Sequence, residues 1–491
     1  MLFDSLTFAV YLPLVLILFI SFSQYRKYTL LIASYVFYGW WDWYYLPLLM
    51  FSTFMAYFCA MKIEENDKKS LKKKYLLLGI GSNLILLSFF KYFNFINAQF
   101  DTILTSLGFN YLVPYSSLLL PMGISFFVFQ AIGYLIDVYR SDIKAENNIV
   151  DFALFVSFFP QLVAGPIERA GNLIEQLKSK LSFSEENFVY GLGRLLWGLV
   201  KKIVISNLLA VFVNQVYNGP SEYDGVVIVI ATVFFAFQIY CDFSGYSDMA
   251  IGLARMFGIR LMENFESPYF SKNIREFWTR WHISLSTWFK DYLYIPLGGN
   301  RKRVYTNLFI VFVVSGLWHG ANWNFVIWGA LHGVLLIGTN FLLKRTPLFS
   351  NWNFSVLSGL FTFSFVCFAW IFFRSNDWES TKILLSNLLT FEPIYIKDLL
   401  YQIKLGLFHP SKLGEPLNLD FGRINFQLSI GGFILSGVFI VLLVLIEAFG
   451  KRLVLDFGVE KNSTYLKLVV FSFLILFFGV FSSNQFIYFQ F

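Results

Sequence analysis

The stretch IVFVVSGLWHGANWNFVIWGALHG, residues 310–333, is apolar enough to enter a lipid bilayer, yet it contains His319 and His332 and no Lys, Arg, Asp or Glu. An ionisable side chain at bilayer depth is costly, and it usually lines a cavity and serves a function. Imidazole also takes and gives protons near neutral pH. The stretch therefore predicts membrane helices and makes His319 a candidate general base, with a histidine bonded between helices as the alternative. For His332 the structural role is favoured.

The whole chain has the composition of a membrane protein. Of its 491 residues, 57% are hydrophobic, 21% are aromatic and 14% are charged, whereas about 25% of a soluble domain is charged. A membrane-spanning helix needs about 20 apolar residues, and about twelve stretches approach this length. These stretches are residues 6–22, 28–45, 47–61, 75–96, 118–138, 203–217, 226–256, 305–320, 323–343, 355–373, 426–449 and 465–482. We therefore expect an all-α polytopic bundle surrounded by the lipid bilayer.

Positive charge collects in short segments between these stretches. The formal net charge is +7, and Lys and Arg in short loops mark the cytoplasmic side of a membrane protein. We expect the loop at residues 68–74 and a loop at Lys201 and Lys202 on that side, and both chain ends on the other. The first span is expected to be retained, because it lacks the basic segment and cleavage site of a signal peptide. Nucleic acid is not expected as a partner. The three cysteines show no paired spacing, so neither a disulfide framework nor a metal site is expected.

Three further regions are not expected to cross the membrane as simple helices. Residues 262–303 are amphipathic and rich in Trp, Arg and Lys, which is typical of an interfacial or re-entrant segment. Residues 151–170 are short and interrupted by Pro and Gly, so we expect a re-entrant segment covered by protein. Residues 374–425 mix charges of both signs and predict an external loop with short helices.

The segment RWHISLSTW, residues 280–288, places His282 within a basic and aromatic region. Residues 267–303 hold seven basic side chains against two acidic ones. Because guanidinium groups bind phosphate through paired hydrogen bonds, this face could hold a phosphorylated donor such as a coenzyme A thioester. Anchoring to anionic lipid explains it equally well. The candidate donor-binding residues are Arg275, Arg280, Trp281, Lys290 and Arg301.

Two carboxylates lie in the apolar stretch FQIYCDFSGYSDMAIG, residues 237–252, with no basic residue beside them. Asp242 and Asp248 must therefore find donors elsewhere in the bundle. They would orient a histidine, line a channel or join a polar network that holds helices together, and the network is favoured. Trp318 and Asn322 lie next to the candidate base and could donate hydrogen bonds to a carbonyl oxygen that gains charge.

Five motifs together resemble the membrane-bound O-acyltransferases (MBOATs), in particular the bacterial branch that O-acetylates polysaccharides such as alginate and peptidoglycan. They follow one another in order through residues 121–333, and weaker similarity extends to both ends of the chain. The motifs are PMGISFFVFQAIGYLIDVYR (121–140), FFPQLVAGPIER (158–169), YCDFSGYSDMAIGLARMFGI (240–259), NIREFWTRWHISLSTWFKDYLYIPLGGNR (273–301) and SGLWHGANWNFVIWGALHG (315–333).

The resemblance implies one MBOAT domain over residues 1–491, built as a helical bundle around a funnel that meets a cytoplasmic thioester channel. His319 corresponds to the family's catalytic histidine, and His282 corresponds to a second family position. The donor would be acetyl-CoA or an acyl carrier, with no cofactor and no metal. The protein would lie in the bacterial cytoplasmic (inner) membrane.

The last six residues, FIYFQF at 486–491, resemble an aromatic C-terminal acyl-transfer motif. From composition alone, this segment is an aromatic terminus at the membrane surface. The resemblance implies instead that Tyr488 accepts the acetyl group and passes it to an extracytoplasmic partner of the SGNH esterase type. That partner would acetylate the polysaccharide.

Two other functions fit part of the sequence. A transporter of a cell-envelope precursor would also have broken helices and polar residues in mid-membrane, but the chain shows no pair of similar halves. A scaffold that docks polysaccharide enzymes through residues 374–425 would leave His319 unexplained. Release of coenzyme A from acetyl-CoA is expected of the acyltransferase and of neither alternative.

Overall fold

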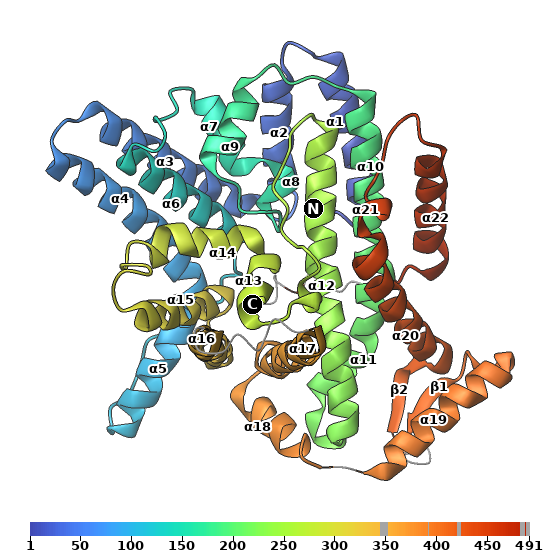
Figure 1. Cartoon of the computed structure of the whole chain (residues 1–491). Helices are drawn as coiled ribbons and strands as arrows, with labels where there is room; N and C mark the ends of the chain where they lie inside the picture. The colour runs from blue at the N-terminus through green and yellow to red at the C-terminus, as the bar shows by residue number, and fades with distance from the viewer. Residues whose placement is uncertain (344–351, 391, 420–423, 482–486, 488–491) are drawn as a thin grey trace. The chain divides into compact units, whose positions relative to one another are not determined.

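The computed structural model describes residues 1–343, 352–390, 392–419, 424–481 and 487. Almost all of its regular structure is helical (Figure 1). In lipid, a helix satisfies its backbone hydrogen bonds within its own segment, so long apolar stretches fold as helices. The chain divides into two compact units, which we describe separately. The first comprises Met1–Leu195, Ser247–Glu263 and Ser284–Leu297, and the second comprises Leu196–Tyr246, Asn264–Ile283 and Gly298–Phe491.

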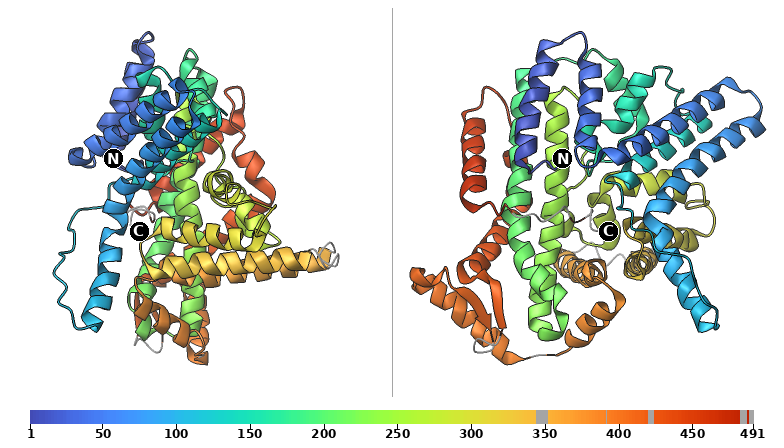
Figure 2. Two further views of the ribbon diagram at one scale, coloured as in Figure 1. Left: turned by 90° about the vertical axis from the view of Figure 1, so that its left-hand side faces the viewer. Right: turned by 180° about the vertical axis from the view of Figure 1, so that it is seen from behind.

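The first unit contains the N-terminal helices. They are α1 (Leu6–Ser21), α2 (Arg26–Gly39), η1 (Trp43–Tyr45), α3 (Leu46–Glu65), α4 (Lys69–Leu87), η2 (Ser88–Tyr92), α5 (Phe93–Ser106), α6 (Ile124–Arg140), α7 (Ile149–Ser157), α8 (Phe159–Leu162) and α9 (Ala170–Lys178), followed later in the chain by most of α14 (Ile283–Phe289) and by η6 (Lys290–Tyr294). Helices α3, α4 and α6 pack against one another, and α7 packs against α2 and α9 (Figure 2). Gly123 precedes α6 at φ 72°, where a Cβ would collide with the backbone oxygen of Leu162.

Two long helices have residues in both units. One is α12 (Gly225–Met256), which has 32 residues. The other is a continuous helix of 34 residues, Glu185–Asn218. It consists of α10 (Glu185–Leu199), the π-helical turn η3 (Val200–Ser206) and α11 (Asn207–Asn218).

The expected cytoplasmic loop at Lys201 and Lys202 is wrong. Both lysines lie in η3, and both are buried. Lys202 Nζ lies 2.5 Å from Asp242 Oδ1, and Lys201 Nζ donates to Ser244 Oγ at 2.9 Å. Because these partners replace water, two adjacent cations can lie inside an apolar bundle. The stretch expected at 203–217 is therefore part of a longer helix.

The second unit contains the C-terminal helices and a short sheet. In addition to η3 and α11, its elements are η4 (Pro220–Glu222), η5 (Pro268–Phe270), α13 (Ile274–Arg280), α15 (Val304–His319), α16 (Trp323–Leu343), α17 (Trp352–Arg374), α18 (Trp378–Asn387), α19 (Pro393–Phe408), η8 (Pro410–Lys412), β1 (Pro416–Leu419), β2 (Ile424–Ser429), α20 (Ile430–Leu445), η9 (Ile446–Gly450), α21 (Lys451–Val454) and α22 (Asn462–Phe478). Helices α15 and α16 form a tight hairpin, and α17 packs beside α16. Strands β1 and β2 are antiparallel, with Asn418 opposite Asn425.

The all-α polytopic fold expected from the sequence is confirmed for the described residues, although the bounds of several spans differ. Seven described helices are long and apolar enough to cross a membrane. They are Trp43–Glu65, Lys69–Ser106, Glu185–Asn218, Gly225–Met256, Trp323–Phe341, Val356–Arg374 and Ile430–Gly450. Shorter apolar helices are Leu6–Ser21, Val304–His319 and Asn462–Phe478.

The three regions not expected to cross the membrane contain short elements. Residues 151–170 form the end of α7 and the four-residue α8, which meet at Phe158. The basic and aromatic region at 262–303 contains α13, α14 and η6, none longer than seven residues. The region at 374–425, whose external position stays a prediction, contains α18, α19, β1 and the first two residues of β2. The hairpin of β1 and β2 was not anticipated by an all-α prediction.

Candidate active site

His319 is the last residue of α15, and its side chain is buried within aromatic rings. The imidazole meets Trp318 and Trp328 edge-on, each with ring centroids 5.0 Å apart. It meets Phe373 of α17 edge-on at 5.4 Å. The candidate base therefore lies in an apolar enclosure built by three successive helices of the second unit.

The hairpin of α15 and α16 fixes the position of this histidine. The two helices cross at Gly316 and Gly329, where a Cβ on either glycine would collide with a backbone oxygen of the opposite helix. A turn of three residues joins them, and within it Asn322 Oδ1 accepts from the backbone N–H of Asn324 at 2.9 Å. Asn322 thus caps the start of α16 through its side-chain oxygen. Its amide NH₂ group is the part that would donate to a reacting carbonyl, and this role stays a prediction.

His282 is fully buried and has a constrained backbone. Its φ is 43°, in the left-handed region that non-glycine residues seldom adopt. Asn264 holds it from two directions: its Oδ1 lies 3.2 Å from His282 Nδ1, and its backbone oxygen accepts from Ile283 N–H at 3.0 Å. A carbonyl oxygen can only accept, so this contact is a hydrogen bond in the tautomer that carries a proton on Nδ1. Strained backbone of this kind concentrates at functional sites.

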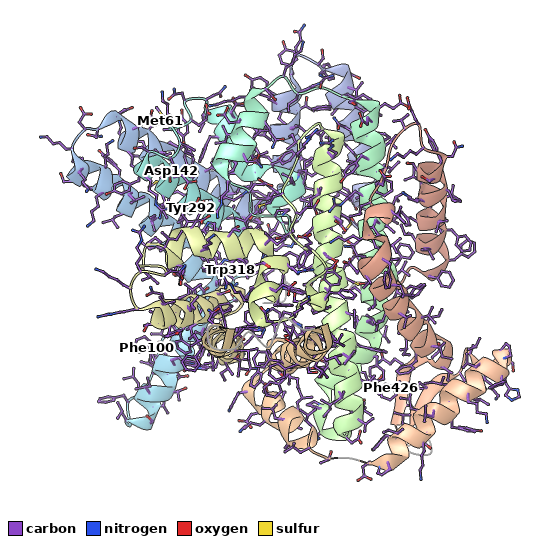
Figure 3. The ribbon with its side chains drawn as sticks, in the orientation of Figure 1. Met61, Phe100, Asp142, Tyr292, Trp318 and Phe426 are labelled. Atoms are coloured by element: carbon purple, nitrogen blue, oxygen red, sulfur yellow. The ribbon has the colours of Figure 1, made fainter. Side chains whose placement is uncertain are left out.

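Trp318, labelled in Figure 3, contacts both candidate histidines. Its ring centroid lies 6.1 Å from that of His282 and 5.0 Å from that of His319. Two buried imidazoles around one indole can exchange protons with a substrate in a site with little water. The structure thus brings together His282, Trp318 and His319, which were predicted as site residues.

His332 lies one aromatic ring away from His319. Trp328 contacts both, with centroids 4.9 Å from His332 and 5.0 Å from His319. Trp278 of α13 meets the His332 ring edge-on at 5.1 Å. Among the described residues, neither ring nitrogen of His332 has a hydrogen-bond partner. The structural role favoured for His332 therefore rests on packing and stays a prediction.

Each of the two carboxylates of α12 has a basic partner. Asp242 forms the buried pair with Lys202. In the first unit, Asp248 Oδ1 accepts from Arg194 Nε at 2.8 Å, and the same guanidinium also binds the carboxylate of Glu263. These contacts place Asp242 and Asp248 in polar networks between helices. Their expected supporting roles in the chemistry stay predictions.

The five candidate donor-binding residues differ in exposure, and they do not all belong to one unit. Arg275 and Arg301 are exposed, and Arg280 forms an ion pair with Glu276 at 2.7 Å. Trp281 is buried and packs on Trp370, with centroids 5.2 Å apart. Lys290 is also exposed, but it belongs to the first unit while the other four belong to the second. Donor binding by these residues stays a prediction.

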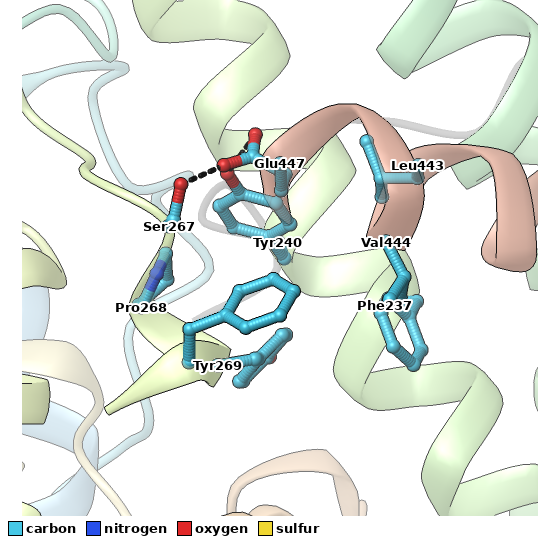
Figure 4. A pocket seen from close by; sticks show the side chains of 9 residues that line it. Phe237, Tyr240, Ser267, Pro268, Tyr269, Leu443, Val444 and Glu447 are labelled. Atoms are coloured by element: carbon cyan, nitrogen blue, oxygen red, sulfur yellow. Dashed lines mark hydrogen bonds between the residues drawn. The ribbon is translucent and has the colours of Figure 1, made fainter. Parts of the chain in front are cut away.

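Glu447 of η9 is a partly buried acid that the sequence reasoning missed. Its carboxylate accepts from the hydroxyls of Tyr240, at 2.7 Å, and of Ser267 (Figure 4). These three residues line a small pocket, together with Phe237 and Tyr269. A lone acid at the end of an apolar run was the available signal. Asn264 offered no such signal, because its partner His282 lies 18 residues away, beyond η5 and α13.

Tyr488 lies outside the described residues. Its neighbour Ile487 is described and buried, and the backbone N–H of Ile487 donates to Asp242 Oδ2 at 2.7 Å. No group of three or more His, Cys, Asp or Glu side chains that could hold a metal occurs in the described part of the chain.

Comparison with known proteins places these features in a family. The family model for MBOAT, membrane-bound O-acyltransferase family, matches residues 143–376. A probable alginate O-acetylase of Pseudomonas putida is 42% identical over 388 residues, covering 77% of this chain and 78% of the relative. A peptidoglycan O-acetyltransferase of Helicobacter pylori is 40% identical over 391 residues, covering 74% and 73%. A teichoic acid D-alanyltransferase of Bacillus subtilis is 29% identical over 286 residues, covering 54% and 71%.

These matches confirm the resemblance drawn from the five motifs. The segment matched by the family model contains the buried site, including Asn264, His282, Trp318 and His319. The described helices have the length and composition of a multi-pass membrane protein. The chain therefore belongs to the membrane-bound O-acyltransferase family and is an acyl-transferring enzyme of the membrane.

Proposed function

We propose that this enzyme moves an acetyl group from a cytoplasmic thioester donor, acetyl-CoA, across the bacterial cytoplasmic membrane for O-acetylation of an extracytoplasmic polysaccharide. Its relatives named for alginate and peptidoglycan O-acetylation, at 42% and 40% identity, support the acetyl group and the class of acceptor. The observation that carries the proposal is His319, buried at the end of a rigid hairpin. An ionisable group in such a position is usually retained for chemistry.

The first step of the proposed mechanism is attack on the thioester by the phenol of Tyr488. A phenol has a pKa near 10 and is a weak nucleophile until its proton is removed. His319 takes that proton while the phenolic oxygen bonds to the carbonyl carbon. The carbon–sulfur bond then breaks, and the proton passes to the sulfur. The products are free coenzyme A and an acetyl ester of Tyr488.

Two neighbours are proposed to assist this step. His282, oriented by Asn264, would hold the thioester or share the proton. The carbonyl oxygen gains negative charge during attack and needs a hydrogen-bond donor. The indole N–H of Trp318 and the amide NH₂ of Asn322 are the proposed donors. The exposed basic side chains of Arg275 and Arg301 would attract the phosphates of the donor.

The second step transfers the acetyl group from Tyr488 to an extracytoplasmic partner of the SGNH type. A serine hydroxyl of that partner attacks the tyrosyl ester, and the phenol of Tyr488 is regenerated. The partner then acetylates a polysaccharide hydroxyl. Support for this step is the resemblance of FIYFQF to an acyl-transfer motif, since this chain shows no SGNH motif of its own.

The test uses the purified full-length protein with acetyl-CoA labelled in the acetyl group. Release of coenzyme A and label on the C-terminal peptide are measured for wild type, His319→Ala and Tyr488→Phe. His409→Ala is the matched control, because His409 is exposed and no role is assigned to it. We expect wild type and the control to release coenzyme A and to label the peptide. His319→Ala should slow release by about 10²- to 10⁴-fold, the range for loss of a general base.

Three results would change the proposal. A folded His319→Ala protein that works at the wild-type rate would remove His319 as the base. Coenzyme A release without peptide label, equal in wild type and Tyr488→Phe, would keep the enzyme and remove the tyrosine relay. A wild type that releases no coenzyme A would point to a carrier-protein donor or to transport of a cell-envelope precursor.

A further inference from the structure

The C-terminal tail, which follows α22, is bound at two separate points: Val480 contacts η3 and the start of α11, and Ile487 contacts Asp242 of α12. At the first point, the backbone N–H of Val480 donates to Ile203 O at 3.0 Å, and Asn207 Nδ2 donates to Val480 O at 2.8 Å. Both backbone polar groups of Val480 are therefore bound by this segment of the long helix. All of these residues belong to the second unit.

At the second point, the tail is bound through a buried ion pair. Asp242 and Lys202 are 1% and 2% exposed, and their charged atoms lie 2.5 Å apart. The other oxygen of Asp242 accepts the N–H of Ile487 at 2.7 Å. A hydrogen bond to an ionised acceptor is about twice as strong as one between neutral groups. The carboxylate thus bridges a cation from η3 and the backbone of the tail.

A buried ion pair adds little net stability, because removing two charges from water is costly. The neighbouring cation, Lys201, is directed to Ser244 at 2.9 Å. The two adjacent lysines of the π-helical turn are both buried and have different partners, and such turns occur frequently at functional sites. The pair of Asp242 and Lys202 therefore has a role that stability alone does not explain, and its other contact is the tail.

We infer that Asp242, charged and oriented by Lys202, is a positioning residue that holds Ile487 in the core so that the acetyl group is delivered to the tail and not to water. This inference rests on the proposed role of Tyr488, the residue that follows Ile487 in the sequence. The polysaccharide and the soluble partner play no part in it.

The first test removes the donor and leaves the ion pair untouched. Proline has no N–H, so Ile487→Pro abolishes the hydrogen bond to Asp242. Ile487→Val is the matched control, because it keeps the N–H and a branched apolar side chain. The rate at which carboxypeptidase removes C-terminal residues measures how firmly Ile487 is anchored. The amount of acetyl label on the tail per coenzyme A released measures how efficiently the acetyl group is delivered to it.

The second test removes the acceptor without leaving a buried charge alone. Lys202→Met is combined with Asp242→Asn in one variant and with Asp242→Leu in the other. Asn and Leu have similar size, but only Asn keeps an oxygen that can accept from Ile487. The two double variants therefore differ at the atom on which the inference depends, and equal thermal unfolding establishes that both fold.

We expect Ile487→Val and the double variant Lys202→Met with Asp242→Asn to resemble wild type. In Ile487→Pro and in the double variant Lys202→Met with Asp242→Leu, carboxypeptidase should remove C-terminal residues at least roughly tenfold faster. This is the effect expected for loss of a hydrogen bond to a buried group. Label per coenzyme A released should fall by a similar factor, while coenzyme A release itself continues. A merely structural role would lower release and label together.

Two outcomes would overturn the inference. One is a tail that carboxypeptidase digests no faster in Ile487→Pro, or in the double variant Lys202→Met with Asp242→Leu, than in wild type. The other is an exposed tail that is labelled as efficiently as in wild type. If wild type releases coenzyme A but never labels its tail, the proposed relay fails, and the carboxypeptidase comparison still decides whether Asp242 anchors Ile487.

Discussion

At the scale of the residue, the most constrained side chain of the site is His282. Its backbone lies at φ 43°, and its ring is held by Asn264 in the second unit. A ring that is held in one orientation can exchange a proton only with a group that lies in that direction. Asn264 therefore matters to the chemistry only through the histidine that it orients.

We predict that Asn264→Leu slows acyl transfer by about 10- to 100-fold, because an unsatisfied buried donor costs about 1–3 kcal/mol. Asn264→Asp keeps an acceptor oxygen at the same place and should retain most of the activity. The measurement is coenzyme A release as a function of acetyl-CoA concentration. We expect kcat to fall more than KM rises, since Asn264 orients a group and does not bind the donor. An unchanged kcat in a normally folded Asn264→Leu protein would contradict this role.

Sequence reasoning found some site residues and not others for a physical reason. His319 and His282 were found because a titratable side chain in an apolar or basic aromatic stretch is unusual by itself. Asn264 and Lys202 were not found, because their importance comes from contacts with residues 18 and 40 positions away. An isolated amide or lysine gives no local pattern that predicts such a contact.

At the scale of the element, the hairpin of α15 and α16 depends on close helix packing. Gly329 faces the backbone oxygen of Phe312 so closely that no Cβ fits between them. Glycine at such a crossing lets helix backbones approach each other in a membrane. Because α15 ends at His319, the packing of α15 against α16 determines where the candidate base lies.

We predict that Gly329→Ala destabilises the protein by about 1–3 kcal/mol through overpacking and lowers the rate of acyl transfer. Gly338→Ala, in the same helix, is the control, because a Cβ added there would meet no atom within 4 Å. That control should be neutral or stabilising by up to about 1 kcal/mol, the helix preference of Ala over Gly. Thermal unfolding in detergent and coenzyme A release are measured on both. Equal unfolding of the two variants would contradict the close crossing.

The existence of the helices was predictable from the sequence, but several of their ends were not. Apolar runs of the right length identified the stretches that became α12 and α16. The predicted apolar stretches ended at charged residues, so the lysines of η3 were interpreted as part of a loop. In the structure Lys202 is paired with the carboxylate of Asp242 and Lys201 donates to the hydroxyl of Ser244, both on α12. A hydropathy window cannot distinguish a paired charge from a solvated one.

At the scale of the whole molecule, the loop charges predict how the chain is oriented in the membrane. Lys73, in the basic segment at 68–74, is exposed and is expected on the cytoplasmic side. Glu415, in the external region at 374–425, is exposed and is expected on the opposite side. The three native cysteines are all buried and should react slowly with thiol reagents.

We predict that a membrane-impermeant maleimide applied to intact cells labels Glu415→Cys and does not label Lys73→Cys. After the membrane is permeabilised, both variants should react. Wild type measures the background from Cys59, Cys241 and Cys367. Labelling of both variants from the same side of the intact membrane would refute the orientation expected from the loop charges.

How the helices combine into units could not be predicted from the sequence. The bond between Asp242 and Ile487 joins residues 245 positions apart. Asp248, six residues beyond Asp242 on the same helix, belongs to the other unit and pairs with Arg194. Local periodicity carries no information about such partners. The five motifs identified the family because they occur together and in order, and not because any one of them predicts a contact.

The π-helical turn η3, Val200–Ser206, has a consequence for changes in chain length. A π-helical turn holds one residue more than an α-helical turn, because its hydrogen bonds span five residues and not four. Loss of a single codon within the turn would restore ordinary α-helical spacing and leave the flanking helices facing as they do now. The same loss elsewhere in Glu185–Asn218 would rotate everything beyond it by about 100°. The segment that carries the two buried lysines is thus the place where this long helix can shorten without turning.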